Sequence, residues 1–257
     1  MSGRGHRRAQ WIEVVRGGLE ERIALMAPSR RLRLALAEEV LVKFACKRPI
    51  RVLDAGAGDG LLSLSIADRH RDWTVVGMDV RDDLLAGARE RAANRGLANS
   101  RFEHTDLTRT LPESGFDAVM ALECLSEIVD DRQAVRAMVG ALRPGGLFVL
   151  QVPDQRWKPI LPGSPGRWRD EVRHGYTGEE LVEMLRDAGL ADIALRPTFH
   201  LGVAIAQEMR DRVKDSSLAL RAALFPLLTA PVVLERHGMA WGRGNALLVV
   251  AQAPGGA

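Results

Sequence analysis

The sequence predicts an α/β fold, a doubly wound and mostly parallel seven-stranded sheet with helices on both faces. Short apolar segments that suit buried strands alternate with segments of helical periodicity from residue 51 onward. The first strand is followed at once by a glycine-rich turn and a helix, and later strands end in acidic residues. This alternation indicates right-handed βαβ units, whose sheet binds ligands at the carboxyl ends of its strands.

The composition is that of one globular domain. The 257 residues suffice for a single large α/β domain and are too few for two ordinary domains with linkers. Apolar residues make up 46% and charged residues 27% of the chain, and the net charge is only +3. Because basic and acidic residues are mixed along the chain, no nucleic-acid partner is expected.

The two cysteines bear on compartment and metal content. Cys46 and Cys124 are far apart in the chain, and no Cys or His residues stand at zinc spacing. We therefore expect neither a disulfide scaffold nor a metal site. The basic residues near the N-terminus are not followed by the apolar core of a signal peptide, so a reducing cytoplasm is the expected location.

The first 45 residues suit helices. Apolar residues between 9 and 27 recur at helical spacing. Ser29 can cap a second helix, which Pro49 ends. One face of that helix carries an apolar residue every fourth position, namely Leu32, Leu36, Val40 and Phe44.

The nucleotide-binding signal lies at residues 51–67. A strand over 51–55 leads into Gly56, Gly58 and Gly60, and a helix follows. Glycines there permit positive φ and let a ligand approach bare backbone, while the helix offers free N–H groups at its start. A nucleotide-like ligand is the expected occupant.

Acidic residues follow the next three strands. The strand 74–79 ends in Asp79, about 20 residues beyond the glycines, where doubly wound folds place a carboxylate on a ribose. The strand 101–106 ends in Asp106, which could receive an adenine amino group, and Glu123 follows the strand 116–121. All three side chains are expected to face one crevice.

The second half contains a fifth strand and an irregular segment. A helix opened by Asp130 runs to Leu142 and ends at Arg143–Gly146, before a strand over 147–152. Prolines and glycines then interrupt residues 153–178, where the candidate substrate contacts are Trp157, Trp168 and Tyr176. Thr177 and Glu180 form a capping box for the next helix.

A long insertion separates the last two strands, 191–200 and 245–251. Residues 201–245 are too many for a passive connection. The apolar stretch 218–234 contains Arg221 and two prolines, so it is a poor membrane span. Three interpretations stay open: a helical cap over the substrate pocket, a dimer contact, or an interfacial surface for a lipid-linked substrate.

These motifs together resemble the class I S-adenosylmethionine-dependent methyltransferases, whose fold is Rossmann-like. The resemblance is carried by the 54–60 loop, Asp79, the segment 104–107 and the segment 142–146, in the expected order. A dinucleotide fingerprint would instead put its third small residue at Leu61, so the spacing favours a methyltransferase over a dehydrogenase.

The resemblance implies S-adenosyl-L-methionine as cofactor and assigns its contacts. Gly56, Gly58 and Gly60 would face the methionine part, and Glu123 would lie near the methyl donor. Asp79 would take the ribose hydroxyls. The remaining cofactor contacts are Asp54 and Ala55 beneath the loop, Val80 beside Asp79, and Asp106 with Leu107 at the adenine.

The resemblance to these methyltransferases also implies one domain over residues 1–257, with five parts. These are an N-terminal helical lid (1–45), the cofactor-binding core (46–155), a substrate-side segment with a helix and a strand (156–200), the helical insert (201–245), and the last strand with a tail (246–257).

Methyl transfer to a hydroxyl needs alignment and a base. The candidate bases are His174, Glu123, Asp154 and His200, and His174 is preferred because its pKa normally lies near neutrality. The signatures of nucleobase, ribose and metal-dependent catechol methyltransferases are missing. We therefore expect O-methylation of a small-molecule, sugar or lipid-linked acceptor by a monomer or homodimer, with peripheral membrane contact for a lipid-linked acceptor. The alternatives are N- or C-methylation, an NAD-type dehydrogenase, or a non-catalytic cofactor-binding partner of another protein.

Overall fold

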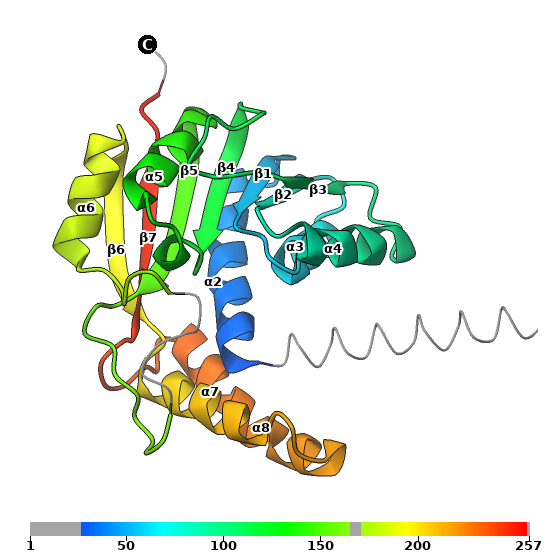
Figure 1. Cartoon of the computed structure of the whole chain (residues 1–257), viewed down its shortest axis with the longest axis vertical. Helices are drawn as coiled ribbons and strands as arrows, with labels where there is room; N and C mark the ends of the chain where they lie inside the picture. Colours follow the sequence, from blue (N-terminus) through cyan, green and yellow to red (C-terminus); the bar gives the residue numbers. More distant parts are fainter. Residues whose placement is uncertain (1–26, 165–170, 256–257) are drawn as a thin grey trace, which may run out of the picture.

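A seven-stranded sheet forms the centre of the molecule (Figure 1). The computed structural model describes residues 27–164 and 171–255. The strand order is β3-β2-β1-β4-β5-β7-β6. The strands are β1 (Arg51–Ala55), β2 (Thr74–Asp79), β3 (Ser100–His104), β4 (Phe116–Leu122), β5 (Leu142–Pro153), β6 (Ala191–Thr198) and β7 (Ala246–Gln252).

The pairing confirms the predicted doubly wound, mostly parallel sheet. β1 pairs in parallel with both β2 and β4, and only β7 runs antiparallel to its neighbours β5 and β6. The chain order reverses between β1 and β4, which is where open α/β sheets bind their ligands. The site is therefore expected beyond the carboxyl ends of these two strands.

Helices cover both faces because successive strand residues point to opposite sides. Leu53 and Val119 pack on the side of α5 and α6, whereas Val52 and Ala118 pack on the side of α2 and α3. The helices are α2 (Pro28–Ala45), α3 (Leu61–Arg69), α4 (Asp82–Asn94), the short 3₁₀ turn η1 (Leu125–Glu127), α5 (Asp131–Gly140), α6 (Gly178–Asp187), α7 (Leu201–Val213) and α8 (Leu218–Arg236). The helix expected within 9–27 falls almost wholly outside the described residues.

The boundary between α5 and β5 differs most from the prediction. The helix expected to reach Leu142 ends at Gly140, and β5 begins at Leu142 rather than at Leu147. Phe116 pairs with Leu142, and the register then shifts so that Ala118 pairs with Leu147. The Pro–Gly–Gly stretch is therefore an irregularity inside a long strand, with Gly145 at a φ of +70°.

The 201–245 insert forms two helices at the end of the sheet toward which β4 points (Figure 1). Both helices pack against α2. Glu235 of α8 accepts hydrogen bonds from the backbone N–H groups of Phe199 (2.8 Å) and His200 (3.0 Å), so α8 is held to the start of α7. Within the described part of the chain, no helix combines the length and the hydropathy needed to cross a bilayer.

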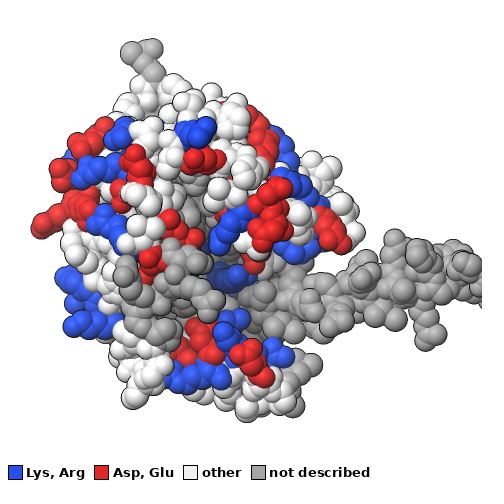
Figure 2. Space-filling model, viewed as in Figure 1, with Lys and Arg blue, Asp and Glu red and all other residues white. Residues whose placement is uncertain are grey.

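Charges of both signs are interspersed on the face shown in Figure 2. Many are paired across elements, as in the contacts of Asp117 with Arg48 (2.8 Å) and Arg143 (2.7 Å).

Candidate functional site

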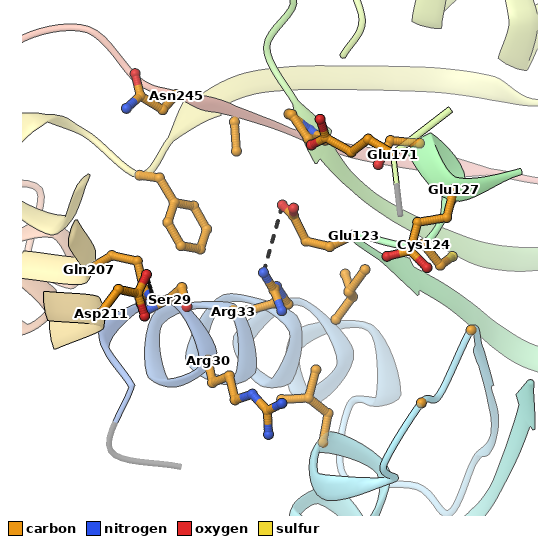
Figure 3. Close-up of a pocket in the computed structure, with 18 of the residues that line it drawn as sticks. Ser29, Arg30, Arg33, Glu123, Cys124, Glu127, Glu171, Gln207, Asp211 and Asn245 are labelled. Atoms are coloured by element: carbon orange, nitrogen blue, oxygen red, sulfur yellow. Dashed lines mark hydrogen bonds and ion pairs between the residues drawn. The ribbon is translucent and has the colours of Figure 1, made fainter. Parts of the chain in front are cut away.

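A cavity of about 860 Å³ opens beyond the carboxyl ends of β1 and β4. The loop 56–59 and Arg81 line one end, α2 contributes Arg30 and Arg33, and α7 forms the opposite wall. Figure 3 shows Arg33 of α2 facing Glu123, which follows β4. The cavity lies at the switch point of the sheet, as its topology requires.

The glycine loop depends on close backbone approach. Gly56 has a φ of +76°, and a Cβ atom there would lie 2.3 Å from the Cβ of Cys124. Gly60 has a φ of +69°, but a Cβ there would meet Ala88 at 2.6 Å and Phe102 at 2.7 Å. Gly56 and Gly58 line the cavity, whereas Gly60 packs against α4 and β3. The predicted contact of Gly60 with the cofactor is therefore not seen in the geometry.

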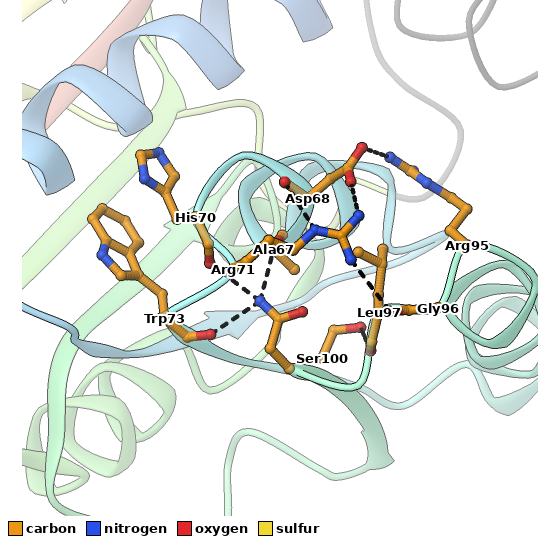
Figure 4. Close-up of polar contacts among 10 residues, drawn as sticks. Ala67, Asp68, His70, Arg71, Trp73, Arg95, Gly96, Leu97 and Ser100 are labelled. Carbon is orange, nitrogen blue, oxygen red and sulfur yellow. Dashed lines mark hydrogen bonds and ion pairs between the residues drawn. The ribbon is translucent and has the colours of Figure 1, made fainter.

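The helix after the loop is held at its far end by Asn99. The Asn99 amide nitrogen lies 2.9 Å from the carbonyl oxygen of Ala67, 3.1 Å from that of His70 and 3.0 Å from that of Trp73 (Figure 4). Asp68 pairs with Arg71 and Arg95 beside these contacts. α3 is thereby fixed while its first residues, Leu61 and Leu62, line the cavity.

Asp79 organises the loop from β2. Its side chain is buried, and its carboxylate accepts hydrogen bonds from the N–H of Gly58 (2.7 Å) and the N–H of Arg81 (2.9 Å). Asp79 therefore ties the glycine loop to the next strand, and a ribose would have to share its oxygens. Val80 beside it is 62% exposed.

Asp54 lies beneath the glycine loop and does not line the cavity. It is buried, and the hydroxyl of Ser63 donates a hydrogen bond to its carboxylate. Burial raises the pKa of Asp54 to about 7, and the charges of Asp79 and Asp59 add to this effect. Ala55, the next residue, is fully buried and presents its carbonyl to the thiol of Cys124.

The predicted adenine contacts lie just beyond β3. Asp106 is partly exposed and accepts hydrogen bonds from the backbone N–H (2.9 Å) and hydroxyl (2.7 Å) of Thr108. These bonds lower the pKa of Asp106. Leu107 is buried in the core, and neither residue lines the cavity.

Glu123 and Arg33 form a charged pair in the cavity wall. A guanidinium nitrogen of Arg33 lies 3.8 Å from the Glu123 carboxylate, and the Arg33 Nε donates to the side chain of Gln151 at 3.2 Å. Glu123 has a φ of +68° and donates its backbone N–H to the Gln151 carbonyl. Burial raises the pKa of Glu123 and lowers that of Arg33, while their mutual attraction opposes both shifts.

The preferred base, His174, does not line the cavity. Its Nε2 is 3.1 Å from the carbonyl oxygen of Trp157, and its Nδ1 is 3.9 Å from Glu171. Trp157 and Glu171 do line the cavity. The other two candidate bases also have charged partners. His200 lies beside Glu235, and Asp154 pairs with Arg156.

The substrate contact predicted for Tyr176 is wrong. The side chain is fully buried, and its hydroxyl donates to the Leu125 carbonyl (3.1 Å) and the Asp131 carboxylate (2.9 Å). Tyr176 therefore anchors the irregular segment to η1 and α5 and cannot reach a ligand. Trp168 lies outside the described residues.

The sequence analysis missed the contribution of α7. Glu208 is buried and accepts hydrogen bonds from the N–H groups of Ile160 (2.9 Å) and Leu161 (2.8 Å) and from the Ser164 hydroxyl (2.7 Å). These bonds lower the pKa of Glu208 despite its burial. It thereby joins the segment after β5 to the wall of the cavity. Because Arg210, Asp211 and Arg212 follow Glu208, the sequence carries no signal that this glutamate is buried.

Arg33 was missed as well, although its position carried a signal. It interrupts the run from Leu32 to Ala37, in which every other residue is apolar. A single cation on the buried side of a helix requires a partner, which Glu123 and Gln151 supply. Among the described residues, no group of three or more His, Cys, Asp and Glu side chains is arranged to hold a metal ion.

Relatives by sequence include several methyltransferases. Residues 52–146 match the model of a methyltransferase domain family. A trans-aconitate 2-methyltransferase of Methylobacterium radiotolerans is 27% identical over 205 residues, covering 74% of this chain and 76% of the relative. The trans-aconitate 2-methyltransferase of Variovorax paradoxus is 34% identical over 124 residues, which cover 48% of this chain and 46% of the relative. A ubiquinone biosynthesis O-methyltransferase of Ruegeria pomeroyi is 32% identical over 155 residues, covering 56% and 61%.

Solved structures share the fold. Phosphoethanolamine N-methyltransferase 2 of Haemonchus contortus, in complex with S-adenosyl-L-methionine, gives a TM-score of 0.64 at 21% identity, covering 84% of this chain and 51% of that one. The [4+2]-cyclase SpnF gives a TM-score of 0.57 at 22% identity, and the match covers 86% of this chain and 82% of the cyclase chain. Residues 52–146 form a methyltransferase domain, and the chain has the fold of the class I S-adenosylmethionine-dependent methyltransferases. It spans less than half of the Variovorax relative and about half of the Haemonchus chain.

The cofactor of these methyltransferases is S-adenosyl-L-methionine, and the residues of this methyltransferase fit it. Bare backbone at Gly56 and Gly58 faces the cavity, where side chains would obstruct a ligand. The carboxylates of Asp59, Glu123 and Glu127 also line it, and they suit the positive charge of a sulfonium.

Proposed function

We propose that this chain transfers the methyl group of S-adenosylmethionine to an oxygen atom of a small molecule, and that a small carboxylic acid is the first acceptor class to test. The observation that carries the proposal is the cavity, which joins the glycine loop at one end to charged side chains of α2 and α7 at the other. Two relatives named trans-aconitate 2-methyltransferase and one named ubiquinone biosynthesis O-methyltransferase support acceptors of this size.

In this proposal, the loop Gly56–Asp59 and Asp79 hold the cofactor, and Asp106 borders its adenine. The bound cofactor supplies a methyl group on a positively charged sulfur, which is open to in-line attack. The protein then has to align the acceptor and exclude water. Trp157 and Phe199 supply apolar surface in the same cavity for the acceptor.

The arginines support an anionic acceptor. Arg30 and Arg33 from α2 and Arg212 from α7 line the cavity, and guanidinium groups bind carboxylates in a bidentate geometry. A carboxylate with a pKa of about 4 is ionised at neutral pH, so its oxygen attacks without a base. The product would be a methyl ester and S-adenosylhomocysteine.

A hydroxyl acceptor would instead require a base. Glu123 is the first candidate, because it lines the cavity and burial raises its pKa. It replaces His174 in that role, because the His174 ring lies outside the cavity wall. A hydroxylated quinone is the acceptor to test under this alternative. A cytoplasmic location belongs to the same proposal, and the free thiols of Cys46 and Cys124 support it.

The test begins with calorimetric titration of the full chain with S-adenosylmethionine, S-adenosylhomocysteine and NADH. We expect micromolar binding of the first two ligands and none of the third. Transfer of labelled methyl groups is then measured with trans-aconitate, citrate and a hydroxylated quinol. Binding of NADH alone would restore the dehydrogenase, and cofactor binding without transfer to any acceptor would favour the non-catalytic alternative.

A further inference from the structure

Arg33 keeps most of its hydrogen-bond donors available to a ligand. Its side chain is only 17% exposed, and its Nε donates to the Gln151 side chain at 3.2 Å. Within the described part of the chain, Glu123 is the only carboxylate paired with it, and the two groups lie 3.8 Å apart, beyond hydrogen-bond range. The terminal nitrogens of the guanidinium can therefore donate to a ligand in the cavity that Arg33 lines.

The two other arginines named above for an anionic acceptor already have close partners. Arg30 donates to the Asp59 carboxylate at 2.8 Å. Arg212 is exposed to solvent and donates to the carbonyl oxygen of Pro162 at 2.6 Å. A carboxylate that binds Arg33 would instead form charge-assisted bonds in a partly desolvated place, where such bonds are strong.

The surroundings of Arg33 belong to the acceptor end of the cavity. Its guanidinium lies 5.9 Å from the centre of the Phe199 ring, which precedes α7. Arg30, one helical turn earlier, reaches the glycine loop through Asp59. A cofactor on that loop would lie nearer to Arg30, so a carboxylate at Arg33 would come from the acceptor.

Gln151 holds the Arg33 guanidinium in place. Gln151 is 1% exposed, and it is the one polar residue in the apolar run 147–152 of β5. Its amide nitrogen donates to the Thr198 hydroxyl at 3.0 Å, which leaves its amide oxygen for Arg33. Its backbone carbonyl accepts the N–H of Glu123 at 2.8 Å, so one residue positions both members of the charged pair in Figure 3. Because the amide is neutral, it orients Arg33 without cancelling its charge.

We propose that Arg33 binds a carboxylate of the acceptor other than the one that is methylated, and that Gln151 is the positioning residue for this contact. The inference rests on the proposed function. A carboxylate held by two guanidinium N–H bonds has its charge engaged and is a poor nucleophile. The acceptor should therefore carry at least two carboxylates, one held by Arg33 and one free to attack.

The free carboxylate performs the displacement. Its oxygen forms a bond to the methyl carbon while the bond from that carbon to sulfur breaks, and the electron pair of the broken bond stays on sulfur. The products are a monomethyl ester and S-adenosylhomocysteine, and no proton is transferred.

The test compares acceptors with and without a second carboxylate. Transfer of labelled methyl groups is measured with trans-aconitate, which has three carboxylates, and with crotonate, which has one. The intact chain should prefer trans-aconitate by about 100-fold in kcat/KM. In Gln151→Glu the new carboxylate neutralises Arg33, so the KM for trans-aconitate should rise about tenfold. The kcat, transfer to crotonate and S-adenosylhomocysteine affinity should change far less, whereas a general structural fault would affect all of them.

Thr198 offers a matched pair of variants that leaves Gln151 itself unchanged. Thr198→Val removes the hydroxyl that orients the amide, and Thr198→Ser keeps it. We expect Thr198→Val to raise the KM for trans-aconitate about fivefold and Thr198→Ser to retain the value of the intact chain. Thermal unfolding checks that each variant is folded, and this pair decides the question if Gln151→Glu does not fold.

The outcomes separate this inference from the proposed function. Equal kcat/KM for the two acids in the intact chain would leave carboxylate methylation standing and overturn the role of Arg33. An unchanged KM in both Gln151→Glu and Thr198→Val would overturn the role of Gln151. A loss of S-adenosylhomocysteine affinity without a change in the KM for trans-aconitate would assign Arg33 to the carboxylate of the cofactor. Transfer to neither acid would refute the carboxylate acceptor itself, and this inference with it.

Discussion

Asp54 shows how a buried carboxyl group can tune the cofactor site. It lies under the glycine loop among Asp59 and Asp79, and only Ser63 and the more distant Arg33 favour its charged form. Burial raises its pKa from 3.8 to about 7, so the folded protein retains a proton that the unfolded chain releases. A cationic ligand nearby would favour release of that proton.

This shift predicts a pH dependence of stability. Because the folded pKa of Asp54 is raised, its contribution is full below about pH 4 and is lost as the pH rises toward 7. The wild-type protein should therefore lose stability between pH 5 and pH 8. The Asp54→Asn variant should lose about 2 kcal/mol less of its free energy of unfolding over the same pH range. Urea unfolding at both pH values measures it, with Asp83→Asn on the exposed start of α4 as the control. An unchanged fall would contradict the assignment.

Glu123 distinguishes the two acceptor classes. If the acceptor is a hydroxyl, Glu123→Gln should lower kcat about 100-fold and abolish the acid limb of the pH–rate profile, because the base is lost. If the acceptor is a carboxylate, kcat should change far less, because no proton is transferred. Steady-state kinetics with labelled cofactor measures both, and cofactor affinity checks that the site is intact. A large loss with a carboxylate acceptor would contradict this reasoning.

At the scale of elements, the loop between β1 and α3 is built around contacts that admit no side chain. The Cβ of Cys124 occupies the space that a side chain at position 56 would need. The backbone N–H of Gly56 donates to the Met78 carbonyl at 2.8 Å, so the loop cannot move away without breaking its bond to β2.

Gly56→Ala should therefore both destabilise the protein and weaken cofactor binding. We expect a loss of about 1–3 kcal/mol in the free energy of unfolding and at least a tenfold loss in S-adenosylhomocysteine affinity. Gly140→Ala is the matched control, because a Cβ there meets nothing within 4 Å at the end of α5. Chemical unfolding and calorimetry measure the two effects, and equal behaviour of the two variants would refute the packing argument.

Glu208 is the link between two elements that the sequence keeps apart. Its lowered pKa means that it stabilises the folded state above the unfolded value of about 4.5 and loses that effect as the pH falls through the folded pKa. Glu208→Gln should remove a charge-assisted bond and loosen residues 160–164, with proteolysis there several-fold faster at pH 7. Glu183→Gln on the exposed side of α6 is the control. The difference in proteolysis rate between the two variants should become smaller in acid. A difference that does not change with pH would rule out the proposed role of Glu208 in holding residues 160–164.

At the scale of the whole molecule, the cavity unites parts of distant origin. The sheet supplies the glycine loop and Glu123, α2 supplies Arg33, and the insert supplies the α7 wall. A ligand that fills the cavity therefore touches the core and the insert together, and its binding should stabilise both.

S-adenosylhomocysteine at 100 times its Kd should raise the free energy of unfolding by about 2.7 kcal/mol, whereas NADH should not. Hydrogen exchange should slow both in the loop 56–59 and in α7. Thermal unfolding and exchange measured by mass spectrometry test this. Protection confined to the loop would show that the cofactor alone does not couple the two parts, and addition of the acceptor would then be the decisive comparison.

The sequence by itself determined the elements and the class of ligand. Strand, glycine turn and helix are local features, because φ at Gly56 and the apolar run 51–55 depend on neighbours in the chain. Asp79 and Glu123 could be placed at one edge because parallel strands align their carboxyl ends. These expectations about the sheet agree with the structure.

Only the tertiary structure decided which side chains reach the cavity. Arg33 and Glu208 enter it, while Tyr176 is buried behind η1 and His174 is turned toward the Trp157 carbonyl. Irregular backbone carries no periodicity from which a side chain's direction can be read. An ion pair such as Arg33–Glu123, between residues 90 positions apart, exists only because the sheet topology brings α2 against the end of β4.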